Sequence, residues 1–278
     1  MTDRRTTLDE LARELDPAAQ RALAQLAGVA PLALEACLRI PAAPGEIVAG
    51  FGVERRDLVV AAARLVAPGH AARVARWLDA LPATTDVGFK LAGRPGDLQI
   101  YARGDYPPAQ LVAAFDAAEV ARSPIVICNG LALFDQRTAH MVGLELRDAG
   151  ASGAVYAAVR RTRALARAIT DAFGFLATAL VPDAVAVWTP VAPILLEAAG
   201  EEIAYVSFAP VERDGWVKLD VAERPIAVAR RVVEAAGFAD AWPPVLAQVA
   251  ARAIERWSHI GVRLAGSGGA VVLYHAVT

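Results

Sequence analysis

The chain has 278 residues, enough for one large domain or two small ones. Its formal net charge of −2 and pI of about 6.1 provide no basic footprint for nucleic acid or an anionic membrane surface, so we expect neither as a partner. A composition that is 56% hydrophobic predicts extensive burial rather than disorder. Two cysteines, Cys37 and Cys128, and the lack of a Cys/His cluster at zinc spacing argue against a disulfide framework and a structural metal. They indicate a reducing, cytoplasmic location.

No segment of the sequence is suited to membrane insertion. Residues 1–7 are polar and run directly into an amphipathic helical pattern, so we expect no signal peptide. The most apolar run, 173–196, contains Pro182, Asp183 and Pro190, which are costly in a lipid-exposed helix. We therefore expect buried helices broken by a loop, in a soluble protein.

Helical and hairpin patterns alternate along the whole chain. Helical spacing of apolar residues predicts helices over 8–27, 57–81, 108–121, 162–179, 184–199, 225–237 and 241–257. Pairs of alternating strands around Gly- or Pro-rich turns predict hairpins over 35–54, 86–103, 140–160, 203–221 and 258–278. The third hairpin is expected to turn over 148–153. Within 123–138, Ile125–Cys128 is either a short strand or a buried connection.

Four hairpins share one pattern. Each begins with a five-residue strand whose first residue is apolar and whose second is small, and a Gly-rich break and a second alternating strand follow. The small positions are Gly88, Gly143, Ser207 and Gly261. Successive positions are 55, 64 and 54 residues apart, and self-similarity at such a period predicts a stacked or closed array of one supersecondary unit. Because every helix needs a sheet face to cover, the pattern favours an α+β fold, a ten-stranded antiparallel β-barrel of five helix–hairpin repeats wrapped by an outer ring of helices. We expect a single domain over 1–278; the alternative is two open sheets side by side, which no linker supports.

Strand side chains alternate between two faces, and in a helix-covered barrel the apolar face must point outward. One register in each of the last four hairpins then collects the charged and aromatic side chains in the lumen. The inward set is Gly88, Lys90, Gln99, Tyr101, Arg103, Met141, Glu145, Arg147, Tyr156, Arg160, Tyr205, Ser207, Trp216, Lys218, Asp220, His259, Gly261, Arg263, Val272 and Tyr274. The same face could be the solvated side of an open sheet. The recurrence of tyrosine at one place in three hairpins favours the lumen.

The number, order and length of the repeats resemble those of the ABBA-type aromatic prenyltransferases across nearly the whole chain. In that family, which has the PT-barrel fold, the second strand of a repeat often carries a polar residue, a spacer and a tyrosine that bind or shield an allylic diphosphate. Gln99-Ile100-Tyr101 matches this pattern. The other three hairpins keep part of it, at residues two positions apart. Ala154–Tyr156 and Val272–Tyr274 keep the tyrosine without the polar residue, and Lys218–Asp220 keeps the polar residue without the tyrosine.

The resemblance implies transfer of an allylic prenyl group from a prenyl diphosphate to a small aromatic acceptor inside the lumen. The leaving phosphates need cationic donors, for which the inward candidates are Lys90, Arg103, Arg147, Lys218 and Arg263. The allylic cation needs aromatic faces and shielding from water, for which the lumen supplies Gln99, Tyr101, Tyr156, Tyr205, Trp216 and Tyr274. Glu145 is the candidate to take the proton from the acceptor. Its alternative role is a lumenal salt bridge with Arg147 or Arg263.

The sequence contains no Asp-Asp-x-x-Asp cluster, so we expect no required cofactor, and any magnesium would be held through the substrate. Two other functions stay open: a non-catalytic barrel that binds an apolar or aromatic small molecule, and a cyclase or isomerase that reuses the barrel without binding diphosphate. The incomplete polar-x-Tyr pairs favour these two. The number of inward Arg and Lys residues favours prenyl transfer.

Overall fold

The computed structural model describes residues 12–13, 15–25, 33–41, 46–52, 55–83, 85–92, 94–198, 200–212, 215–266 and 268–277. The N-terminal part of the first predicted helix and most of the first hairpin turn lie outside these residues.

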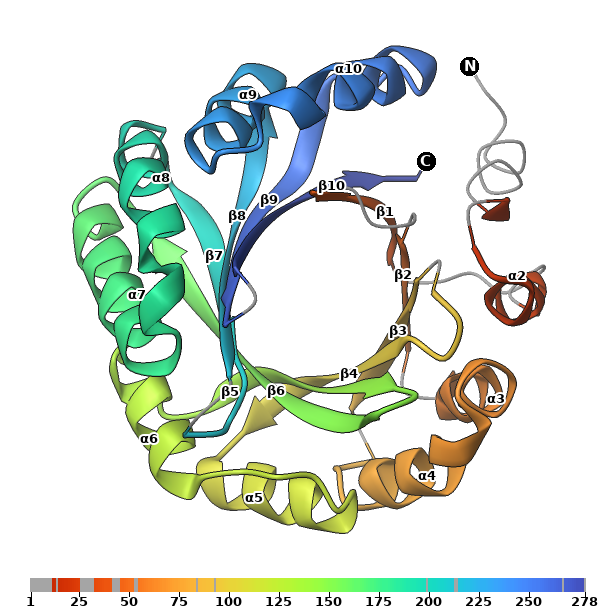
Figure 1. Ribbon diagram of the computed structural model, residues 1–278. Coiled ribbons are helices and arrows are strands. Elements are labelled where there is room, and N and C mark those ends of the chain that lie inside the picture. The colour runs from red at the N-terminus through yellow and green to blue at the C-terminus, as the bar shows by residue number, and fades with distance from the viewer. Residues whose placement is uncertain are drawn as a thin grey trace.

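Ten antiparallel strands close into a barrel, as the sequence predicts (Figure 1). They are β1 (Ala33–Ile40), β2 (Glu46–Phe51), β3 (Asp86–Ala92), β4 (Leu98–Tyr106), β5 (Ala139–Arg147), β6 (Gly150–Arg161), β7 (Glu202–Phe208), β8 (Trp216–Pro225), β9 (Arg256–Ala265) and β10 (Gly268–Ala276). Each strand pairs with its neighbours in the chain, and β1 pairs with both β2 and β10. This last pairing closes the sheet, so the alternative of two open sheets is wrong.

The helices form a ring around the outside of the barrel (Figure 1). They are α2 (Pro17–Ala24), α3 (Arg56–Val66), η2 (Pro68–His70), α4 (Ala71–Asp79), α5 (Pro108–Ala117), α6 (Pro124–Ala132), α7 (Ala166–Leu180), η3 (Pro182–Ala184), α8 (Val185–Glu197), α9 (Ile226–Ala235), η4 (Ala239–Ala241) and α10 (Trp242–Ala251). Among the described residues, α-helical segments precede every hairpin, which confirms the five helix–hairpin repeats. In the same part of the chain, no helix has the length and apolar character needed to cross a bilayer.

The hydrophobic core lies between the outer face of the barrel and the helices. The outward strand residues Phe89, Leu144 and Val206 are buried, as are Trp77 of α4 and Phe173 of α7. Burying one such side chain contributes about 1.5–3 kcal/mol. The apolar half of the strand alternation is therefore committed to the helices, and the other half is left to line the lumen.

Helix α6 corrects the prediction for Ile125–Cys128, which is neither a strand nor a connection. Ser123 caps the helix, since its hydroxyl accepts a hydrogen bond from the Val126 N–H, and proline follows in the first turn. Gly130 brings α6 close to the barrel, because a Cβ there would overlap the ring of Phe208 on β7. The Ser-Pro start was the signal for a helix, and the continuous apolar run concealed it.

Other boundaries also differ from the prediction, and three of them have a common cause. The helix expected over 241–257 ends at Ala251, and β9 begins at Arg256, where it pairs with the end of β8. Pro225 is the last residue of β8 rather than the first of a helix. The third turn is shorter than expected, because Arg147 pairs directly with Gly150. In each case strand pairing in the closed sheet, which is not local in sequence, lengthens a strand at the expense of a helix or turn.

Candidate active site

The lumen contains a cavity of about 300 Å³ to which all ten strands contribute side chains. The predicted site residues that line it are Lys90, Gln99, Tyr101, Arg103, Tyr156, Tyr205, Trp216, Lys218, Arg263 and Tyr274. Glu145 and Arg147 lie nearer the hairpin turns, where they line an adjoining cavity. The structure thus brings the predicted residues together around one lumen, and it places them there through the alternation of the strands.

The small residue of each of the last four hairpins lies opposite a longer lumenal side chain on a neighbouring strand. Gly88 and Gly143 lie directly opposite Tyr101, one on each side of it. A Cβ at Gly261 would overlap the ends of the Asp220 and Lys218 side chains, so any larger residue there would displace this pair. The repeat detected in the sequence therefore alternates small and large side chains around the inside of the barrel.

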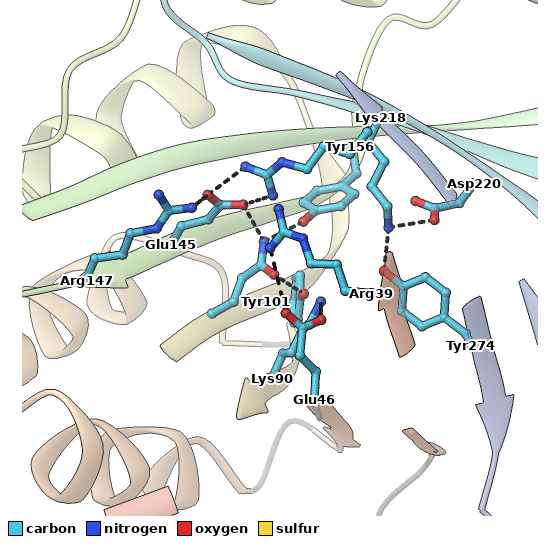
Figure 2. A network of polar contacts seen from close by, with 12 residues as sticks. Arg39, Glu46, Lys90, Tyr101, Glu145, Arg147, Tyr156, Lys218, Asp220 and Tyr274 are labelled. Carbon is cyan, nitrogen blue, oxygen red and sulfur yellow. Dashed lines mark hydrogen bonds and ion pairs between the residues drawn. The ribbon is translucent and has the colours of Figure 1, made fainter. Parts of the chain in front are cut away.

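Glu145 of β5 is the centre of a polar network that crosses the lumen (Figure 2). Arg263 of β9 donates to both carboxylate oxygens, with N···O distances of 2.9 and 3.1 Å, and Arg147 donates at 3.4 Å. Gln99 donates to Oε1 at 2.9 Å. Burial raises the pKa of the Glu145 carboxyl, but Arg263 and Arg147 more than offset this and hold it below its ordinary value. Of the two roles predicted for Glu145, the structure contains the salt bridge.

Two tyrosines form a wall beside this network. The hydroxyl of Tyr101 donates to Oε1 of Gln99 at 2.6 Å, and Gln99 donates to the hydroxyl of Tyr156 at 3.3 Å. Their rings meet edge to face, with centroids 5.8 Å apart. Burial raises the pKa of both phenols, so they stay neutral and present aromatic faces to the cavity.

The two lumenal lysines approach the ring of Tyr274, and each is paired with a carboxylate (Figure 2). Their Nζ atoms lie 5.7 Å (Lys90) and 4.5 Å (Lys218) from the ring centroid. Lys90 pairs with Glu46, and Lys218 pairs with Asp220 at 2.6 Å and donates to the hydroxyl of Tyr274. Burial lowers the pKa of both lysines. Glu46 more than offsets this for Lys90, whereas Asp220 offsets it only in part for Lys218, whose pKa stays lowered.

The open end of the lumen, opposite the hairpin turns, carries an arc of rings. The centroids are 6.0 Å apart between His140 and Tyr205, 5.8 Å between Tyr205 and His259, and 6.1 Å between His259 and Tyr274. Arg103 donates to Nε2 of His140 at 3.1 Å, and burial together with this cation lowers the pKa of His140. The four rings are tilted or edge-on to one another and line one end of the cavity.

Some lumenal residues were missed by the sequence analysis, and one was misplaced. Glu35 and Arg39 of β1 and Glu46 of β2 face inward, although the first hairpin lacks the repeat pattern from which the inward set was chosen. Alternation of Glu35, Cys37 and Arg39 was the signal that could have found them. Arg160, predicted inside, is 77% exposed and pairs with Glu201. It lies near the end of β6 and does not line the main cavity.

Within the described parts of the chain, no group of three or more His, Cys, Asp or Glu side chains is placed to hold a metal ion. The cations of the lumen are instead Arg and Lys side chains.

Solved structures of aromatic prenyltransferases share this barrel. A 6-dimethylallyl tryptophan synthase is 14% identical over 88% of this chain and 81% of its own, with a TM-score of 0.59. NotF in complex with brevianamide F and DMSPP is 12% identical over 100% of this chain and 96% of its own, with a TM-score of 0.60. A second NotF prenyltransferase structure is 13% identical over 89% of this chain and 81% of its own, with a TM-score of 0.52. At these identities the likeness establishes the fold, which confirms the PT barrel that the resemblance implied. No protein-family model and no curated protein sequence matches the chain.

Proposed function

We propose that this chain transfers an allylic prenyl group from a prenyl diphosphate to a small aromatic acceptor in the barrel lumen. The observation that carries the proposal is the combination of basic and aromatic side chains around one cavity. Lys218 lies over Tyr274, and the guanidinium of Arg263 lies 4.1 Å from the ring of Trp216. The reaction needs positive charge at the leaving phosphates and aromatic faces at the reacting carbon, and both are present within one lumen.

The donor's diphosphate is best accommodated around Lys218. The hydroxyl of Ser207, directly opposite Lys218 in the sheet, is buried and has no hydrogen-bond partner among the described residues. A buried hydroxyl without a partner is costly, and a phosphate oxygen would satisfy it. Lys90 approaches the same ring, Tyr274, and Arg103 supplies a second kind of contact from the open end.

The proposed transfer breaks the allylic C–O bond, forms a bond from the allylic carbon to the acceptor ring, and ends when that ring loses a proton. The allylic C–O bond breaks with its electron pair leaving on the diphosphate, and the ring of the acceptor attacks the allylic cation. Tyr101, Tyr156 and Tyr274 supply faces that stabilise the cation and exclude water from it. A cavity of about 300 Å³ lies at the small end of the range for ligand sites, which supports a five-carbon donor and a one- or two-ring acceptor.

A second candidate function rests on the pairing of the lumenal cations with carboxylates. Lys90 is paired with Glu46, Lys218 with Asp220, and Arg263 with Glu145. A diphosphate has to compete with these carboxylates for the same cations. The pairing therefore supports a barrel that binds a neutral aromatic molecule without diphosphate.

We also propose a cytoplasmic location and no obligatory cofactor. Cys37 and Cys128 are both free, and Cys128 is exposed, a state that persists in a reducing compartment. Transfer activity that is unchanged by a magnesium chelator would support the proposal that no cofactor is required, and activity that is lost with the chelator would contradict it.

The experiment that tests the function is a calorimetric titration with dimethylallyl and geranyl diphosphate, followed by product analysis with indole, tryptophan, tyrosine and a dihydroxynaphthalene as acceptors. We expect dimethylallyl diphosphate to bind in the range of about 1 μM–1 mM typical of substrates and to yield a prenylated acceptor. Arg103→Ala should weaken donor binding, whereas Arg160→Gln, outside the main cavity, should not. No binding of either diphosphate refutes prenyl transfer. Acceptor binding alone supports the second candidate.

A further inference from the structure

A histidine and a carboxylate meet at the open end of the lumen, away from the network around Glu145. Nδ1 of His259 on β9 lies 3.6 Å from Oε1 of Glu35 on β1, across the intervening strand β10. The hydroxyl of Ser258 donates to the same carboxylate oxygen at 2.7 Å. Both His259 and Glu35 line the main cavity. The carboxylate is thus oriented by one neighbour and directed at the imidazole.

We propose that His259 is the base that removes the ring proton from the prenylated acceptor, and that Glu35 is the residue that positions it. The inference rests on the proposed prenyl transfer. After the acceptor ring has attacked the allylic cation, the ring carries the positive charge. Nε2 of neutral His259 takes the proton from the substituted ring carbon, and the C–H electron pair restores the aromatic ring. The resulting imidazolium is stabilised by the Glu35 carboxylate at Nδ1.

The surroundings of His259 suit this role. The rings of Tyr205 and Tyr274 flank it, so an aromatic acceptor that packs against this arc from the cavity lies beside the imidazole. Nδ1 is the ring nitrogen that faces Glu35, which leaves Nε2, on the other side of the ring, for the acceptor. The side chain is 26% exposed, so the proton can pass on to solvent after each turnover.

The groups packed around His259 include one carboxylate, that of Glu35, which lies against Nδ1. Burial raises the pKa of the Glu35 carboxyl, but its hydrogen bonds with His259 and Ser258 more than offset this effect. The pKa therefore lies below its ordinary value. Tyr205 of β7 and Tyr274 of β10 face the imidazole, and β8 contributes the mutually paired Lys218 and Asp220. Glu35 is therefore the carboxylate in contact with His259.

Glu145, the base expected from the sequence, is less suited to the step. Both of its oxygens accept hydrogen bonds from Arg263, and Arg147 contacts one of them. Its lowered pKa makes it a weaker base. A proton placed there would break the ion pairs that hold the lumen together, whereas a proton placed on His259 creates one.

The test uses the full chain with dimethylallyl diphosphate as donor. The acceptor is indole, or the member of the acceptor panel that the wild type prenylates, in ordinary and ring-deuterated form. We expect His259→Gln to lower kcat by about 10²–10⁴-fold with little change in KM. Because removal of the ring proton then limits the rate, a primary isotope effect should appear that the wild type lacks. His140→Gln removes the other cavity histidine, whose Nε2 already accepts from Arg103; it should show no isotope effect, whatever its rate.

Glu35→Gln supplies the second readout, which a purely structural role would not move. Loss of the carboxylate destabilises the imidazolium, so the acid limb of the kcat profile should shift to lower pH. A wild type that prenylates no acceptor overturns the proposed function and this inference together. An active wild type whose His259→Gln variant keeps its kcat without an isotope effect overturns the inference alone. If that variant does not fold by circular dichroism, an unshifted acid limb in Glu35→Gln overturns it.

Discussion

Removing either charge of the Lys218–Asp220 pair should change diphosphate binding in opposite directions. Nζ of Lys218 lies 2.6 Å from the Asp220 carboxylate inside the lumen. If the pair is the phosphate site, Lys218→Met removes a cation that the donor needs. Asp220→Asn removes an anion with which the donor competes. If the pair only stabilises the barrel, both variants should instead act in the same direction.

The magnitudes follow from the burial of the pair. A hydrogen bond to a charged group contributes about 1.5–3 kcal/mol, so Lys218→Met should weaken binding of dimethylallyl diphosphate by roughly 10- to 150-fold. Two unit charges about 6 Å apart interact by roughly 3 kcal/mol at an effective dielectric of about 20. Relief of that repulsion should tighten binding to Asp220→Asn by about tenfold or more, after the changed hydration of the site is allowed for.

The gain in Asp220→Asn should depend on pH. Burial already holds the pKa of Lys218 below its ordinary value, and Asp220 offsets part of that effect. Without the carboxylate, the lysine loses its proton at a lower pH than in the wild type. Tighter binding is therefore expected near pH 7 and should disappear at a lower pH than the one at which the wild type loses affinity.

The assay is calorimetric titration of each variant with dimethylallyl diphosphate near pH 7 and at a series of higher pH values. Arg160→Gln is the matched control, since it removes one charge of an exposed pair outside the main cavity and should leave the affinity unchanged. Equal weakening by Lys218→Met and Asp220→Asn would refute the charge-competition argument. So would an Asp220→Asn affinity that equals the wild type near pH 7.

Four further predictions concern shielding and stability. Tyr274→Ala should raise the ratio of prenyl alcohol to prenylated acceptor, measured by chromatography, because water reaches the allylic cation; an unchanged ratio would contradict the shielding role. Glu145→Gln should lower the free energy of unfolding, measured by urea denaturation, by about 3–5 kcal/mol. In a double-mutant cycle, Arg263→Gln should cause little further loss in the Glu145→Gln background, whereas additive losses would show that the pair is not coupled. Because the folded pKa of Glu145 is lowered, its contribution is present above its ordinary value of 4.5 and is lost as pH falls through the folded value, so this variant should be less sensitive to acid. Gly130→Ala, which overlaps a buried ring, should cost about 1–3 kcal/mol, while Gly69→Ala meets no atom within 4 Å and should not lower the melting temperature; equal melting temperatures would refute the close approach of the helix.

Much of the barrel follows from local patterns. Alternation with period two assigned Phe89 outward and Tyr101 inward without any knowledge of the neighbouring strands. The recurring small residue indicated a repeated unit, and five such units with no linker favoured closure. Local pattern failed where pairing extended a strand, as at Trp257, which was expected in a helix and lies in β9.

The contacts inside the lumen depend on closure, which brings together strands that are far apart in sequence. Alternation predicted that Glu145 points inward, but the register and closure of the sheet place it against Arg263, four strands away around the barrel. The same closure sets Glu35 of β1 beside His259 of β9. The sequence by itself determined most of the side chains that share the lumen, because the face of a strand is a local property. Only the tertiary structure decided which of them meet, because the distance across a closed barrel is set by strand number, register and packing together.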